Sequence, residues 1–479
     1  MRADRISLTL EHMRRLRIAL IVGFLAAACG STAGPGTEPA SVAPSATESA
    51  QPSAIAYAGA VPSPTASPPG AAPLSSGAVA DAGVLYVWGA DDGIYRYDGA
   101  TGSLVRVWGM STLSSETASG PYVLGRHGGI TLLRWDGATE PTCPSGSFAA
   151  VSSRGTCAFT GVSGDSAVYV DRGIGGAQML LPADWGAGSY AWSPDGTELV
   201  IVRNERRTDP VPPLEPLWRN TLWHLDRHGA LTKIFDSRNG LSSLYGMKWS
   251  FDGRVAFWEI ATTSNSLAAD GAATTLHVVN VQTGANVDLG TTLGSRAWAQ
   301  WSVDGRLAFV SGGWRQTWEN KQVVVFEPNG TRRVMSGDSG LAKFASRAAI
   351  APAWQPILGT PARLAWIEGP AGGIAASPDY ANGVGPTAQR VAVLETPSGR
   401  ASVTCPGLVT EGVRWSADAR AALLLCRAPG VAQHALQVWY APIGGSPRAL
   451  VTGLGDLGFG YYGLQPSLFD IVAWSLADR

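Results

Sequence analysis

The sequence predicts an all-β chain folded as a β-propeller, a ring of four-stranded antiparallel sheets called blades. A Trp-Ser pair recurs along the chain at a spacing of roughly 50–60 residues, which is the range of propeller blades. Each copy ends a short apolar run and is followed by a tight turn and another apolar run. Gly and Pro, with 59 and 31 of the 479 residues, interrupt every window long enough for an amphipathic helix beyond the first 30 residues.

The repeated motif predicts the hairpin that joins the first and second strands of a blade. In the W-S-P-D-G copy, Ser193 to Gly196 has the composition of a type I turn, with Pro second and Gly last. We expect the motif Trp side chains to pack between blades and the turn aspartates to accept hydrogen bonds from backbone amides of their own turns. These structural residues are Trp192, Asp195, Trp249, Asp252, Trp301, Asp304, Trp415 and Trp474, with a drifted W-Q-P copy at Trp354.

Further apolar runs predict the third strand of each unit, and Gly-containing turns followed by a more polar strand complete it. These third strands are expected at residues 94–97, 132–135, 222–225, 276–279, 323–326, 391–394 and 436–439. Four antiparallel strands in each repeat, arranged radially, are the propeller plan.

The ends of the repeat region predict how the ring closes. The Trp-Ser copies give six units, a weaker copy at Val151 gives a seventh, and residues 110–145 give an eighth without the Trp signature. We expect eight blades, with seven as the alternative. The last copy supplies only a first strand, at residues 472–475, whereas residues 84–107 supply three strands without a first. The two fragments would complete one shared blade and remove exposed sheet edges.

The W-S-P-D-G repeat followed by an apolar strand resembles the TolB-type, WD40-like propeller repeat, and the resemblance covers residues 84–479. It implies a propeller domain at 81–479. Such blades occur in periplasmic adaptors, beside peptidase domains and in many exported proteins, so the motif is specific for the fold and poor for function. Because no α/β domain precedes the propeller here, a role in the Tol system does not carry over.

The N-terminus predicts export and a lipid anchor. Arg14 to Arg17 is basic, and the apolar run that follows is too short to span a bilayer, as in a signal peptide covering residues 1–28. The segment ending at Cys29 resembles a bacterial lipobox, with Leu25 one position further from the Cys than the pattern prefers. The alternative is an ordinary signal with an incidental Cys. The Pro-, Ser- and Ala-rich residues up to 80 predict a disordered tether, so that 29–80 links lipid to propeller.

Charge and cysteines limit the partners and the compartment. A formal net charge of −1 gives no electrostatic case for nucleic acid. The other four cysteines fall in matching contexts, where one ends a fourth strand and the other lies in the second strand of the next blade. They predict the disulfides Cys143–Cys157 and Cys405–Cys426, in keeping with an exported protein. Metal binding is the weaker alternative, because neither a Cys-x-x-Cys pair nor a His cluster is present.

Known catalytic motifs are absent or isolated, so we predict no catalytic residue, cofactor or metal site. Residues 337–340 match a Gly-Asp-Ser-Gly sequence without accompanying His and Asp contexts. Residues 453–458 match G-x-G-x-x-G without the helix that a dinucleotide site needs. His127, His224, His228, His277 and His434 are scattered, and packing or surface roles are expected for them.

Long insertions that carry aromatic and charged residues fall between second and third strands, or between one blade and the next. All these connections should share one face of the ring, here called the long-loop face. Binding residues commonly reside in loops, and Trp, Tyr and Arg are typical of recognition surfaces. The candidate binding residues are Arg206, Trp218, Trp314, Trp318, Tyr380, Tyr461 and Tyr462. The alternative for the tryptophans is that they cover loop cores.

Three functions remain open. The sequence favours a noncatalytic, lipid-anchored propeller of the bacterial cell envelope that binds a protein, peptide or glycan. A hydrolase or lyase acting on envelope polysaccharide is the second hypothesis and would need carboxylates clustered near the ring axis. A structural scaffold is the third.

Overall fold

A computed structural model of the chain divides into two units, residues 1–64 and 65–479, and residues are described only in the second. The described residues are 74–474 without 92, 110–111, 118–119, 125–128, 144–146, 161–166, 173–175, 207–217, 238–241, 262–273, 293–297, 313–317, 319–320, 337–346, 357–360, 372–384, 417, 432–435, 455–471. The predicted signal peptide, Cys29 and most of the predicted tether therefore lie outside the described residues.

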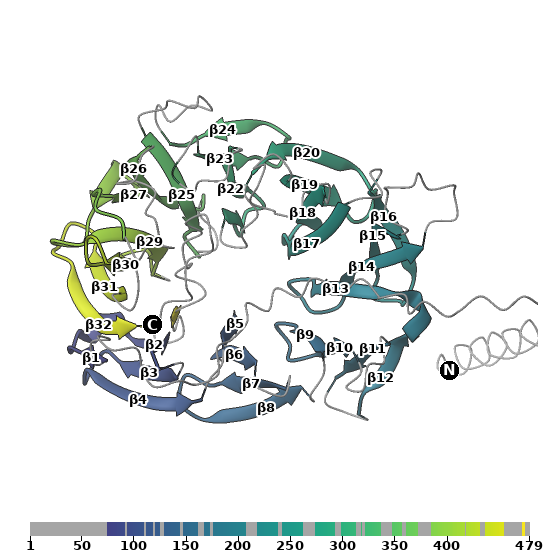
Figure 1. Cartoon of the computed structure of the whole chain (residues 1–479), viewed down its shortest axis with the longest axis horizontal. Coiled ribbons are helices and arrows are strands. Elements are labelled where there is room, and N and C mark those ends of the chain that lie inside the picture. The colour runs from purple at the N-terminus through teal and green to yellow at the C-terminus, as the bar shows by residue number, and fades with distance from the viewer. Residues whose placement is uncertain are drawn as a thin grey trace, which may run out of the picture. The chain divides into compact units, whose positions relative to one another are not determined.

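The described strands form eight sheets of consecutive antiparallel strands arranged in a ring (Figure 1). Within a blade the first strand lies toward the centre and the fourth toward the perimeter. Blades 1 to 4 contain, in sheet order, β33 (Val472–Trp474), β2 (Val84–Trp88), β3 (Ile94–Asp98), β4 (Ser103–Trp108); β5 (Thr112–Thr117), β6 (Gly120–Leu124), β7 (Ile130–Leu133), β8 (Thr139–Cys143); β9 (Ser147–Val151), β10 (Cys157–Thr160), β11 (Val168–Asp171), β12 (Gln178–Leu181); β13 (Ala187–Trp192), β14 (Leu199–Arg206), β15 (Trp218–Leu225), β16 (Leu231–Asp236).

Blades 5 to 8 contain β17 (Ser242–Trp249), β18 (Arg254–Ala261), β19 (Thr274–Asn280), β20 (Asn286–Thr291); β21 (Ala299–Trp301), β22 (Leu307–Ser311), β23 (Gln322–Phe326), β24 (Arg332–Val334); β25 (Arg347–Trp354), β26 (Leu364–Pro370), β27 (Val391–Thr396), β28 (Gly399–Val403); β29 (Val409–Trp415), β30 (Ala421–Arg427), β31 (Leu436–Pro442), β32 (Arg448–Leu454). Two 3-10 turns, η1 (Ala80–Ala82) and η2 (Ala183–Trp185), are the helical elements of the described residues.

The prediction of eight blades is confirmed, and so is the shared closing blade. Strand β33 pairs antiparallel with β2, with Leu85 opposite Trp474 and Val87 opposite Val472. Each predicted third strand overlaps an observed one. The unit without a Trp signature is a full blade, because β5 supplies the first strand that its sequence did not reveal.

The propeller begins earlier than predicted. Residues 74–80 were assigned to the tether, but β1 (Ser75–Ser76) adds a fifth strand to the outer edge of blade 8 by pairing with β32. The segment then crosses to blade 1, where the carbonyl of Gly77 accepts a hydrogen bond from the Tyr97 hydroxyl at 2.7 Å. Small and polar residues make these contacts largely through backbone, so apolar patterning does not reveal them.

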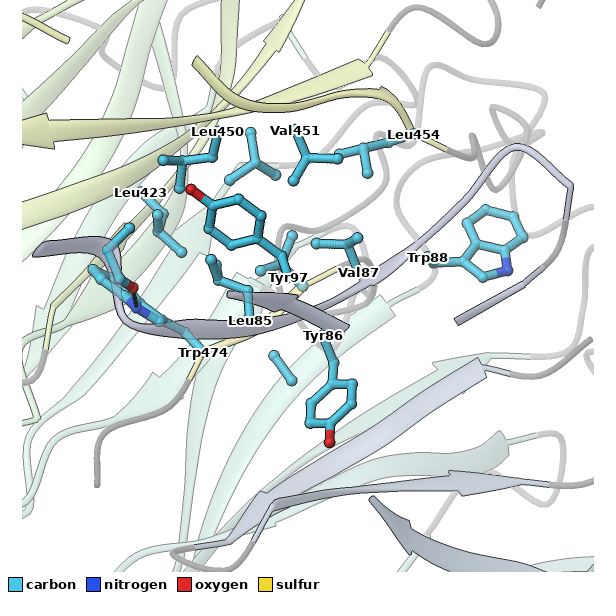
Figure 2. Packing of buried hydrophobic residues seen from close by; sticks show 14 of the residues in the cluster. Leu85, Tyr86, Val87, Trp88, Tyr97, Leu423, Leu450, Val451, Leu454 and Trp474 are labelled. Atoms are coloured by element: carbon cyan, nitrogen blue, oxygen red, sulfur yellow. Dashed lines mark hydrogen bonds between the residues drawn. The ribbon is translucent and has the colours of Figure 1, made fainter. Parts of the chain in front are cut away.

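The first and last described segments of the propeller thus fasten the joint between blades 8 and 1. The buried cluster at this joint combines Leu85 and Val87 of blade 1 with Leu423 and Val451 of blade 8 and with Trp474 (Figure 2). The indole of Trp474 is 3% exposed, and its Nε1 donates to the carbonyl of Ala82 at 2.7 Å. Strand β33 has only three residues, so side-chain burial rather than strand length holds it in place.

Both predicted disulfides are confirmed. Cys143 at the end of β8 is bonded to Cys157 of the next blade, and Cys405, which follows β28, is bonded to Cys426 of β30, with Cα–Cα distances of 5.7 and 6.1 Å. We expected each pair to meet where second strands end. Cys426 is the second-last residue of β30, but Cys157 is the first residue of β10, so that reasoning holds only for the second bridge.

Replacing Trp474 with Ala should lower the free energy of unfolding by about 3–5 kcal/mol, since a buried indole at the closing joint is lost. Chemical denaturation of the variant measures this. Phe251→Ala is the control, because Phe251 is 68% exposed in the turn between β17 and β18, and it should change stability by less than about 0.5 kcal/mol. Equal stabilities for the two variants would contradict the role of the joint.

Candidate functional site

The motif tryptophans link each blade to the one before it. Trp249 Nε1 donates to the carbonyl of Ala191 at 3.0 Å, and Trp301 Nε1 donates to that of Lys248 at 3.0 Å. Trp192 and Trp354 repeat the contact with Ala150 and Gln300 at 3.2 and 2.8 Å. In every case the acceptor directly precedes the motif position of the previous blade, which is Val151 in the weaker copy.

The motif indoles lie half-buried or buried, as predicted. Trp415 and Trp474 do not make this bond. The buried Nε1 of Trp415 has no hydrogen-bond partner within the described ranges, and this indole, 1% exposed, packs by burial alone. The Nε1 of Trp474 donates to the Ala82 carbonyl, just before β2 of the closing blade.

The turn aspartates do more than was predicted. Asp195 accepts from the Thr197 amide at 3.2 Å, as expected. Asp252 and Asp304 instead bind the guanidinium groups of Arg254 and Arg306 at 2.6 and 2.7 Å. The sequence analysis did not predict a role for these arginines, although both follow the turn aspartate in the same Asp-Gly-Arg motif.

Each of these arginines reaches the following blade. Arg306 lies over the ring of Trp354 at 4.6 Å, and its Nη2 donates to the carbonyl of Ala362. Arg254 makes the equivalent stacking contact with Trp301 at 5.0 Å. An indole thus receives a cation on its face while it donates from its edge, so the face opposite the long loops is a repeated structural joint.

The structure describes only some of the candidate binding residues. Trp314, Tyr380, Tyr461 and Tyr462, and the side chain of Trp218, lie outside the described residues. Arg206 is exposed at the end of β14 and lies opposite Trp218 of β15.

Trp318 was expected on the binding surface, but its indole is 1% exposed. The guanidinium of Arg390 from blade 7 lies 3.9 Å from its ring centroid. A large aromatic group that carries a cation on one face and is shielded from solvent supports the loop rather than contacting a partner. For this residue the alternative of a covered loop core agrees with the structure.

Arg390 belongs to a buried charged group that joins blades 7 and 8 at the long-loop face. Glu411 accepts from Arg390 Nη1 at 3.4 Å and from Arg427 Nε at 2.9 Å, and all three side chains are 0% exposed. Glu411 occupies a bulge of β29, where the pairing register with β30 shifts between Thr410 and Gly412. A bulge re-aims a side chain, which here places the carboxylate between two guanidinium groups.

The disulfide Cys405–Cys426 reinforces the same place. Cys426 precedes Arg427, and the amide of Cys405 donates to the Thr410 hydroxyl at 3.1 Å. Together, four buried side chains form the support cluster: Trp318, Arg390, Glu411 and Arg427.

A second group at the long-loop face was not predicted. Strands β14 and β15 have eight residues each, whereas β10, β11 and β12 of the preceding blade have four. The longer hairpin carries Arg203, Glu205 and Arg219 in a network, with Glu205 at 3.4 Å from each guanidinium. The sequence contains a signal for this group. Alternate residues on one side of the strand are apolar at Leu199 and Ile201 and charged at Arg203 and Glu205.

Two histidines on the third strands of blades 4 and 5 are buried, whereas His228, in the turn after β15, is exposed. His224 and His277 are 5% and 6% exposed, and their Nε2 atoms lie 2.9 and 3.0 Å from Glu198 and Glu259. Ser237 donates to Glu259 at 2.7 Å, so the series runs Ser–Glu–His. A nucleophile activated by histidine needs the imidazole beside the hydroxyl, and this order does not supply it.

Within the described part of the chain, no group of three His, Cys, Asp or Glu side chains is placed to hold a metal ion. The same residues contain no helix of the length and apolarity that a membrane crossing requires.

No protein-family model and no curated protein matches the sequence. Solved structures similar to this one include dipeptidyl peptidase 4 of Porphyromonas gingivalis, at 9% identity over 78% of this chain and 59% of that one, with a TM-score of 0.47. TolB from Acinetobacter baumannii is similar at 15% identity over 52% and 62%, with a TM-score of 0.35. The propeller domain of the trilobed protease from Pyrococcus furiosus is similar at 12% identity over 71% and 97%, with a TM-score of 0.36.

These comparisons concern the fold alone. The chain spans less than two thirds of the length of the dipeptidyl peptidase and of TolB, and no activity or partner is taken from them.

The Asp304 turn predicts a specific acid response. Burial would raise the pKa of Asp304, but hydrogen bonds from Arg306, Ser302 and the Ala362 amide outweigh burial and hold it at about 2, below the ordinary 3.8. As pH falls, the unfolded chain binds this proton first, so the stabilisation is complete above about pH 5 and is lost between about pH 4 and pH 2.

Asp304→Asn should therefore lower stability at neutral pH and flatten its fall between about pH 4 and pH 2. Urea denaturation across this range provides the measurement. Asp184→Asn, an exposed substitution in η2, is the control and should follow the wild-type curve. A parallel pH curve for Asp304→Asn would disprove the linkage.

Proposed function

We propose that this chain is an exported, lipid-anchored and noncatalytic propeller of the bacterial cell envelope that binds a protein, peptide or glycan through its long-loop face. The observation that carries the proposal is the contrast between the two faces of the ring. One face repeats the same Trp, Asp and Arg joint, and the other carries the support cluster, which does not repeat.

Burying ionised groups is expensive, and a buried ion pair is weak evidence of added stability. The repeated joints already hold neighbouring blades together, so a costly, unrepeated cluster favours a role in fixing one geometry. The cluster lies at strand ends from which loops of blades 6, 7 and 8 depart. Rigid strand ends beneath variable loops are the arrangement on which binding sites are commonly built.

The proposed compartment rests on two features. The segment before Cys29 has the layout of a lipoprotein signal, and the propeller contains two disulfides. Disulfides persist in oxidising compartments and are rare in the cytosol.

Partner binding is tested by affinity capture from host envelope with the purified propeller. Replacing Trp314, Tyr461 and Tyr462 together with Ala should remove a partner that the wild type recovers, because aromatic anchors are lost from the loops. Phe251→Ala, an exposed aromatic residue on the opposite face, should retain that partner. Retention by the loop variant, or equal loss by both variants, would count against the long-loop face.

The anchor has its own test. Cys29→Ser should abolish incorporation of a radiolabelled fatty acid and move the protein from the membrane to the soluble fraction, because the acceptor thiol is gone. Ser31→Ala, in the same segment, should leave labelling unchanged. Undiminished labelling of Cys29→Ser would disprove lipidation at this residue.

A further inference from the structure

We infer that the exposed half of blade 4 is a carbohydrate-binding ledge for an extended, uncharged polysaccharide chain. The blade 4 ledge consists of Trp185, Arg203, Glu205, Arg219, Trp223 and Asp236. The inference rests on the proposed function, since the ledge lies at the long-loop end of β14 and β15, and it adds a site and a ligand class.

The register of blade 4 defines the ledge. On the side that faces blade 3, Leu199 lies opposite Leu225, and Ile201 lies opposite Trp223. Leu199, Ile201 and Leu225 are buried in one cluster with Ala158 and Val168 of blade 3. The next positions on the same side are Arg203 opposite Thr221 and Glu205 opposite Arg219. Apolar rows thus give way to charged rows along strands that are longer than those of blade 3.

Three of the four charged side chains of the ledge are partly accessible. Arg203, Arg219 and Asp236 are 30%, 38% and 38% exposed, whereas Glu205 beneath them is 15% exposed. Their mutual contacts are loose, at 3.4 Å from Glu205 to each arginine and 3.7 Å from Arg219 to Asp236. Groups held in a row by long contacts keep donor and acceptor capacity for a ligand.

Two half-buried indoles border this row. The rings of Trp185 and Trp223 lie 5.9 Å apart in an edge arrangement, and the Arg203 guanidinium lies 4.9 and 5.6 Å from their centroids. Arg203 Nε also donates to the Trp185 carbonyl at 2.7 Å. The guanidinium and the indoles fix one another, so little side-chain freedom remains to be lost on binding.

This combination matches a sugar chain. A pyranose ring offers C–H bonds on its faces and hydroxyl groups around its rim. Indole surfaces pack against the first, and planar carboxylate and guanidinium groups bind the second in pairs. The ledge balances Arg203 and Arg219 against Glu205 and Asp236, and Lys233 beside Asp236 is offset by Asp184 beside Trp185. A surface of balanced charge selects neither a polyanion nor a polycation, which favours an uncharged ligand.

The turn between β15 and β16 provides a matched control. Arg227 lies in this turn, at the face of blade 4 opposite the long loops, and its side chain is 67% exposed. Arg219→Ala and Arg227→Ala remove the same group from opposite faces of one blade. Trp185→Ala retains the backbone carbonyl that Arg203 uses, so it tests the indole itself.

The experiment titrates the purified propeller with soluble mannan, arabinogalactan and dextran, with polygalacturonate and polyglutamate as charged probes, and follows tryptophan fluorescence and calorimetric heat. We expect one of the neutral glycans to bind with an affinity that changes little between about 50 and 300 mM salt. Arg219→Ala and Trp185→Ala should each weaken it about tenfold or more, while Arg227→Ala should leave it unchanged.

Three outcomes would overturn the ledge. They are no binding of any neutral glycan, binding of the charged polymers alone with a steep salt dependence, and equal losses in Arg227→Ala and Arg219→Ala. Melting curves of each variant ensure that a loss reflects the site and not the fold. A partner captured through the aromatic loops would survive all three outcomes, so the proposed function and the ledge can fail separately.

Discussion

A ring of sheets is stable only when every blade, including the one made from both chain ends, buries its sides against its neighbours. In this chain the closing contact depends on the three-residue strand β33, which is too short to hold by backbone pairing alone. The burial of Trp474 among side chains of blades 1 and 8 supplies what the strand lacks. The N-terminal segment adds a second fastening on the outside, where β1 extends the edge of β32. An open joint would expose two sheet edges and the apolar sides of two blades.

The remaining joints use one device several times. In four of the motifs the indole donates to the backbone of the preceding blade, and in two of these an arginine from that preceding blade covers the indole face. These joints form at the face of the short turns. The long strand ends of blade 4 and the buried charges of blades 7 and 8 lie at the opposite face. The side chains that differ from blade to blade are thus separated from the repeated contacts between blades.

The Trp-Ser spacing and the incomplete end units were sufficient to predict ring closure and eight blades, with seven as the alternative. The matching contexts of four cysteines predicted both disulfides. Each is a periodic or pairwise property of the sequence. The start of the propeller was missed because Ser75 and Gly77 bind through their backbones. The sequence left open whether Trp318 contacts a partner or covers a loop core, because an insertion's sequence does not show which side chains its loop covers. The ion pairs of Glu411 depend on a bulge and on a residue of another blade, so they cannot be predicted from the local sequence around Glu411. Arg203 and Glu205 could have been predicted from the sequence, because they continue the alternation of Leu199 and Ile201 along one side of the strand.

Hydrogen exchange of the native propeller tests the closing joint most directly. If the two chain ends form one blade, the amides of β2 and β33 should exchange as slowly as those at the centre of β14 and β15, because all of them then require cooperative opening of the ring. Rapid exchange of 84–88 and 472–474, alongside slow exchange in blade 4, would show that the ends do not close the ring and would contradict the account.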